Sequence, residues 1–128
     1  MPFSFHVDER TGVFHIQAIG EVNDAELMDL SGRLQRQVPF IDGYPIFCDC
    51  SAVTAVLISS SLIESLARAA RSRTNFVAVV APRTVVFGLA RMYQILSDPE
   101  DARVRVFAAG ADALAWLYTV VQELPRRL

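Results

Sequence analysis

The segment from Phe76 to Leu96 constrains the fold of this chain more than any other. Residues 76–81 form an unbroken apolar run of strand length, rich in β-branched side chains, which is typical of a strand buried on both faces. Pro82 ends this strand, because its fixed φ and missing N–H suit the first turn of a helix. Apolar residues with helical spacing follow. The predicted inward stripe comprises Val85, Leu89, Met92 and Leu96, with Val86 and Tyr93 beside it. Together the strand, turn and helix make half of a parallel β-α-β unit.

The N-terminal residues predict an antiparallel hairpin. Phe3–Asp8 and residues 14–18 alternate apolar with polar side chains, and residues 9–12 supply the turn. With a loop of this length, His6 lies directly opposite His15 on the outer face. Without a carboxylate cluster or a nucleophile beside them, a solvated strand face is the favoured interpretation of these two histidines, ahead of a metal or catalytic site.

The rest of the chain alternates helices and strands. The first predicted helix is capped by Asn23 and Glu26 and ends at Pro39, and a buried strand at residues 44–50 follows it. An irregular connection at residues 51–60 leads to a second helix, which is capped by Ser61 and Glu64. After the strand and helix of residues 76–96 come a strand at Val104 and Phe107 and a last helix from Gly110. The resulting order, β-β-α-β-α-β-α-β-α, predicts an α/β fold with one mostly parallel sheet and an N-terminal antiparallel hairpin. Residues 1–128 are expected to form a single domain.

Composition excludes several classes of function. All 12 basic residues are arginines scattered along a chain of net charge −2, which argues against a nucleic-acid partner. No apolar run approaches the roughly 18 residues of a membrane span, and the N-terminus lacks the apolar core of a signal peptide. A cytoplasmic protein without a transmembrane segment is therefore expected.

Three strings of residues carry a resemblance to a known group. They are the strand end at residues 49–54 ahead of a serine-rich helix start, FGLARMY at residues 87–93, and ALAWL at residues 113–117. Together they resemble the STAS domains of sulfate transporters and anti-sigma-factor antagonists, and more closely the SpoIIAA-like branch of small bacterial proteins. The resemblance implies a STAS-like fold and a non-enzymatic regulatory or protein-interaction module. Such a module is expected to bind an unknown protein partner or a second copy of itself as a homodimer. The fold is shared with lipid-binding CRAL-TRIO domains, which implies an alternative: a small binding domain for an apolar or amphipathic, lipid-like ligand.

The serines at residues 59–61 form a candidate site at the mouth of a helix. Anti-sigma-factor antagonists have an Asp-Ser-Ser-Gly-Leu motif here, whose first serine is phosphorylated, so the resemblance makes Ser59 a candidate phosphoacceptor. Ile58 replaces the aspartate and Ser61 replaces the glycine, which argues against phosphoregulation. Helix capping is the favoured interpretation of Ser59, Ser60 and Ser61. The free N–H groups of a helix mouth also attract anions, and Arg83 is a further candidate for anion binding.

Cys48 and Cys50 are the only cysteines, and they are too close in sequence to staple a loop. Two residues apart on a strand, both thiols point to one face, where they could bind a soft metal or form a redox pair. No third cysteine is present and the histidines are remote, so buried core thiols are the favoured interpretation and no metal or cofactor is expected.

Phe87 and Arg91 form a candidate interaction surface. They lie four residues apart on the side of their helix opposite the apolar stripe, and an exposed aromatic beside an arginine is typical of an interface anchor. Trp116 in the last helix is a third candidate for the same role. Packing against another part of the same chain is the alternative for Phe87 and Trp116.

Enzyme motifs are missing from the sequence. It has no phosphate-binding loop, no dinucleotide fingerprint, no nucleophile elbow and no paired metal-binding histidines. No catalytic residue is predicted, and the chain is expected not to be an enzyme.

Overall fold

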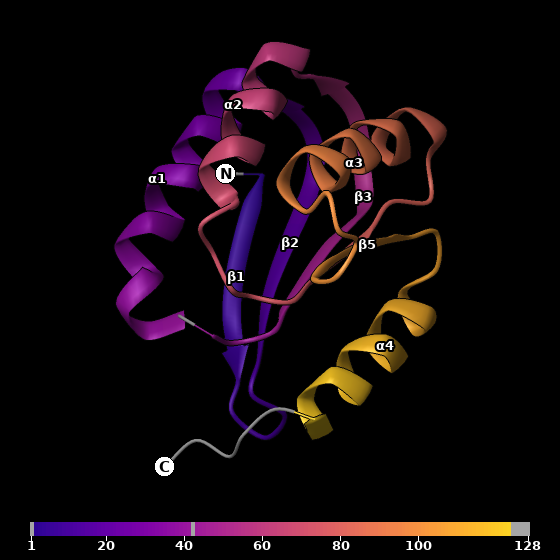
Figure 1. Cartoon of the computed structure of the whole chain (residues 1–128). Coiled ribbons are helices and arrows are strands. Elements are labelled where there is room, and N and C mark those ends of the chain that lie inside the picture. Colours follow the sequence, from indigo (N-terminus) through magenta and orange to yellow (C-terminus); the bar gives the residue numbers. More distant parts are fainter. Residues whose placement is uncertain (1, 42, 124–128) are drawn as a thin grey trace.

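Five strands form one sheet in the part of the chain that the computed structural model describes, residues 2–41 and 43–123 (Figure 1). The strands are β1 (Phe3–Asp8), β2 (Val13–Asn23), β3 (Ile46–Leu57), β4 (Val77–Val80) and β5 (Val104–Phe107). The helices are α1 (Asp24–Ile41), α2 (Ser60–Ala70), α3 (Thr84–Ser97) and α4 (Gly110–Glu123). The order in space is β1-β2-β3-β4-β5, with β1 antiparallel to β2 and the other pairs parallel. The predicted element order and α/β class are therefore confirmed.

The hairpin has the predicted register. His6 pairs with His15, and their rings stack with centroids 4.8 Å apart and planes 6° from parallel. Burial of His15 lowers its pKa, and the neighbouring His6 lowers it further. Burial and the neighbouring ring therefore both favour the uncharged form of His15.

Strand β3 is longer than predicted. Residues 51–57, expected to form an irregular connection, continue the strand and pair with the second half of β2. The register shifts between Gln17 and Ile19 and again between Gly20 and Glu21, so the pattern of alternating burial is interrupted. These irregularities explain the wrong prediction, because a strand with shifted register loses the two-residue period by which it is recognised.

The boundaries of two helices also differ from the prediction. The Asn23–Glu26 capping box is present, with the Glu26 amide donating to Asn23 Oδ1 at 2.9 Å and the Asn23 amide donating to Glu26 Oε1 at 3.3 Å. Helix α1 continues past Pro39 to Ile41, because a proline near the end of a helix removes few backbone hydrogen bonds. Helix α2 is capped by Ser59 rather than Ser61, since β3 ends only at Leu57 and the helix begins at Ser60.

The helices cover the two faces of the sheet unequally. Figure 1 shows α1, α2 and α3 grouped together and α4 apart from them. Helix α4 packs against β3, β4 and β5 through a cluster in which Ala113 and Leu117 meet Phe47, Ala78 and Val80. A second cluster, on the face under α1, joins Leu30 to side chains of β1, β2 and β3. The core is thus divided by the sheet into two parts.

The inward side of helix α3 is centred on one edge of the predicted apolar stripe, so that Val85 falls outside it. Val85, predicted to face inward, is 67% exposed, whereas Val86, Leu89 and Tyr93 face the sheet. The buried side of α3 also contains the polar side chain of Gln94, which donates to Asp101 and accepts from Arg91. An inward glutamine satisfied by these hydrogen bonds is the reason that a purely apolar pattern placed the stripe incorrectly.

Candidate functional site

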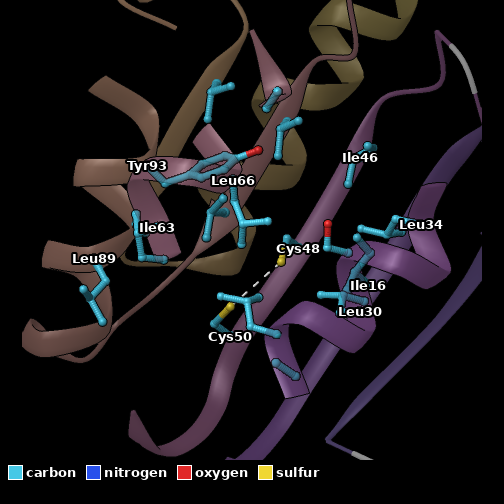
Figure 2. A pocket seen from close by; sticks show the side chains of 18 of the residues that line it. Ile16, Leu30, Leu34, Ile46, Cys48, Cys50, Ile63, Leu66, Leu89 and Tyr93 are labelled. Atoms are coloured by element: carbon cyan, nitrogen blue, oxygen red, sulfur yellow. Dashed lines mark hydrogen bonds between the residues drawn. The ribbon is translucent and has the colours of Figure 1, made fainter. Parts of the chain in front are cut away.

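A cavity of about 250 Å³ lies between the sheet and the three helices α1, α2 and α3. Figure 2 shows its wall, with Cys48 and Cys50 on β3 facing Leu30 and Leu34 of α1 on one side and Ile63, Leu66, Leu89 and Tyr93 of α2 and α3 on the other. Most of the lining side chains are aliphatic, and none is acidic. The site is therefore a small apolar cavity, called the chamber below, whose wall is formed by the sheet on one side and by α1, α2 and α3 on the other.

Small side chains and the placement of α2 explain why the chamber is not filled. Ala18, Ala69, Ala70 and Ala90 line it, and each occupies less space than the leucines and isoleucines around it. Helix α2 packs mainly against α3 rather than against a strand. The alanines at positions 69, 70 and 90 of α2 and α3 are too short to reach the sheet. A space therefore remains between these helices and the sheet.

The two cysteines lie side by side in the cavity wall. Their sulfurs are 3.9 Å apart, within range of an S–H···S hydrogen bond. The hydrogen bond to Cys50 raises the pKa of Cys48 well above its usual value, and burial raises it further. The same hydrogen bond lowers the pKa of Cys50 despite the opposing effect of burial. The thiol pair therefore favours a single thiolate, stabilised by the remaining S–H group, over two thiolates.

Polar groups gather at one end of the cavity. Arg73 and Asn75 follow α2, Arg103 precedes β5, and Tyr93 comes from α3. Arg103 Nη1 donates to the backbone oxygen of Asn75 at 3.2 Å. Arg103 directly precedes β5 and lines the cavity. An otherwise apolar chamber thus has one basic end.

The predicted helix-mouth residues do not form one pocket. Ser59 Oγ accepts from the Leu62 amide at 3.3 Å, as expected of a cap, and the Ser59 amide donates to Asp24 Oδ1 at 2.8 Å. Ser60 and Ser61 are exposed in the first turn of α2. Arg83 occupies the cap position of α3 without a side-chain capping bond, and it borders a surface pocket that contains none of these serines.

The three candidate interface residues are placed differently from one another. Phe87 is half-buried and Arg91 is exposed, with Arg91 Nη1 donating to Gln94 Oε1 at 2.7 Å. Trp116 packs within the chain, with ring centroids 5.9 Å from Phe107 and 6.2 Å from Phe76. Arg105 lies over the indole, its guanidinium carbon 5.2 Å from the ring centroid. The structure therefore does not bring Trp116 together with the Phe87 surface.

The described residues contain neither a metal-binding group nor a membrane-spanning helix. Among residues 2–41 and 43–123, no three histidine, cysteine or acidic side chains are grouped so that they could hold a metal ion. No helix within those same ranges has the length and apolar character needed to cross a bilayer.

The cavity was missed by the sequence analysis, although a signal for it was present. Cys48 and Cys50 lie on one face of a strand and pack against the core cluster under α1, as predicted, and they also line the cavity. Small residues recur on the elements that cover this face, and Ala69, Ala70 and Ala90 are examples. A pattern of small residues does not by itself distinguish close helix packing from an unfilled space, so the volume required coordinates.

Comparisons with known proteins establish the fold. No protein-family model matches the sequence, and no curated protein matches it. Among solved structures, the chain is similar to an uncharacterized protein of the DUF3478 family, described as having a SpoIIAA-like fold, from Shewanella loihica PV-4. The likeness covers 90% of this chain and 91% of that chain, with a TM-score of 0.62 and 13% sequence identity. This chain therefore has a SpoIIAA-like fold, as its resemblance predicted, and its function must be argued from its own residues.

Proposed function

We propose that this chain is a non-enzymatic binding protein that holds a small apolar or amphipathic molecule in the cavity between the sheet and helices α1, α2 and α3. The observation that carries the proposal is the cavity itself, at about 250 Å³ with a largely aliphatic wall. Ligand pockets in proteins are typically somewhat larger, from about 300 Å³ upward, so the ligand is small.

The energetic cost of an empty chamber supports this proposal. The chamber is partly open to solvent, so when no ligand is bound its apolar side chains lack packing contacts and stay exposed to water. A ligand that fills the space restores these contacts, whereas an apolar wall offers water few hydrogen bonds.

The cysteine pair provides a direct test. We expect the neutral dye N-phenyl-1-naphthylamine to become fluorescent on binding and to protect the thiols from iodoacetamide, because Cys48 and Cys50 lie in the cavity wall. At a dye concentration ten times its Kd, alkylation should slow about tenfold, since about one cavity in eleven remains free. The measurement is the alkylation rate by intact-protein mass spectrometry.

Glutathione in the same tube is the control, and its alkylation should be unaffected by the dye. Dye binding without thiol protection would place the dye elsewhere on the protein. Absence of binding by this dye and by small alkanes of similar size would contradict the proposed function.

A protein-interaction role is the second candidate, and exposed apolar side chains favour it. Leu57 at the end of β3 is 63% exposed, and Val85 lies exposed on the same helix as Phe87 and Arg91. If this surface joins two copies of the chain, Phe87→Ala combined with Arg91→Ala should convert the dimer to a monomer in light scattering at micromolar concentration. Tyr118→Ala on α4 is the matched control, and an oligomeric state unchanged in both variants would refute this assignment.

A further inference from the structure

The charge in the cavity wall has one sign. Arg73 and Arg103 are its charged residues, and no aspartate or glutamate of the described chain accompanies them there. Both lie at the end of the chamber where the chain leaves α2 and enters β4 and β5. The wall thus combines a long apolar surface with a localised positive charge.

The two arginines differ in how many hydrogen bonds their side chains already form within the described chain. The side chain of Arg103 donates a hydrogen bond to the Asn75 carbonyl, and its positive charge helps to lower the pKa of Asp98. Arg73 forms no side-chain hydrogen bond or ion pair with the described residues, and its side chain is only half-buried. Of the two, Arg73 has its full hydrogen-bonding capacity available to a ligand.

Tyr93 joins this basic end to the apolar chamber. Figure 2 shows its side chain reaching from α3 into the cavity. Burial raises the pKa of Tyr93, and the charges of Arg73 and Arg103 act in the opposite direction. All three side chains line the same cavity. At neutral pH the phenol is a neutral O–H group that can donate a hydrogen bond to an anion held by the arginines.

We infer that the ligand is an amphipathic carboxylate, with its carboxylate bound at Arg73, Arg103 and Tyr93 and its hydrocarbon chain in the apolar chamber. Charge complementarity selects this class, because an anion gains charge-assisted hydrogen bonds there and meets no acidic neighbour in the cavity wall. The inference rests on the proposed function, since it specifies the head group of a ligand that the cavity holds.

The size of the chamber sets the length of the chain. A cavity of about 150 Å³ accommodates benzene, with six carbons, so a proportionate estimate for this cavity is about ten carbons. Decanoate is therefore a suitable probe, and 1-decanol is its neutral counterpart with the same hydrocarbon length.

The test is competition against N-phenyl-1-naphthylamine, which is uncharged and so reports occupancy of the chamber alone. With the wild-type protein, we expect decanoate to displace the dye at a concentration at least tenfold lower than 1-decanol does. Arg73→Gln should remove most of this preference, and Tyr93→Phe should reduce it partially. Arg105→Gln is the matched control, because Arg105 lies over Trp116 outside the cavity wall, and it should retain the full preference.

The outcomes separate the two proposals. If the dye binds but decanoate and 1-decanol displace it equally, or if Arg73→Gln retains the preference, the carboxylate assignment is wrong and the cavity proposal stands. If neither the dye nor either competitor binds the wild-type protein, the proposed function itself fails. Thermal unfolding of each variant checks that a lost preference is not caused by a lost fold.

Discussion

Replacing Ala90 with leucine should stabilise the protein by about 1–2 kcal/mol and abolish dye binding. Ala90 lies on α3 in the wall of the cavity, so three added carbons enter empty space instead of displacing packed atoms. Each buried methylene contributes about 0.8 kcal/mol, less the cost of fixing the new side chain. The free energy of unfolding is measured by urea denaturation, and binding is measured by dye fluorescence.

Ala113→Leu is the matched control for this substitution. Ala113 is fully buried on α4 within the packed cluster on the opposite face of the sheet. The same three carbons have no space there, so this variant should lose about 1–3 kcal/mol and keep its dye affinity. If Ala90→Leu destabilised the protein as much as Ala113→Leu, the chamber would be closed in solution and the proposed function would lose its main support.

Replacing Asp98 with alanine should cost about 2–4 kcal/mol of stability, because two backbone N–H groups lose their acceptor. Asp98 is 6% exposed, and its Oδ2 accepts from the Arg103 amide at 2.6 Å and from the Val104 amide at 2.9 Å. Alanine leaves both amides without their acceptor, at about 1–3 kcal/mol for each buried group. Glu100→Ala in the same loop is the control, since Glu100 is exposed, and it should change stability little.

The same carboxylate should make stability depend on pH in the acid range. Burial raises the pKa of Asp98, but the backbone N–H groups of Arg103 and Val104 and the charge of Arg103 outweigh it, so the folded-state pKa is below the ordinary value. Its contribution is complete above the unfolded-state pKa of about 3.9 and is lost as the pH falls through the lower folded-state pKa. Urea denaturation across this range should show a shallower pH dependence for Asp98→Ala than for the wild type. Equal slopes would mean that the carboxylate is not held as described.

Parts of this architecture were predictable because they depend on local patterns. The pairing of His6 with His15 followed from strict alternation on both strands and the length of one turn. The Asn23–Glu26 capping box followed from the spacing of two side chains and needed no tertiary context. Where a hydrogen-bonding pattern closes within a few residues, the sequence determines it directly.

Other parts depend on contacts between distant segments, and the sequence analysis missed them. Residues 51–57 form a strand only because β2 extends far enough to pair with them, through two shifts of register. The orientation of α3 depends on Gln94, which can be buried because Asp101 and Arg91 satisfy it. The basic end of the cavity brings Arg73 together with Arg103, thirty positions along the chain, and no local pattern records that proximity.

The order of the strands has a consequence for how the chain reaches its folded state. Each strand pairs only with the strands before and after it in sequence, so no strand has to wait for a partner from the far end of the chain. Every pairing closes a loop of one turn or one helical connection, which keeps the mean sequence separation of contacts low for an α/β topology. During synthesis from the N-terminus, each strand can therefore add to a sheet edge that already exists. Strand β5 is the last of the five in sequence, and the turn that leads into it is held by the hydrogen bonds from the Arg103 and Val104 amides to Asp98.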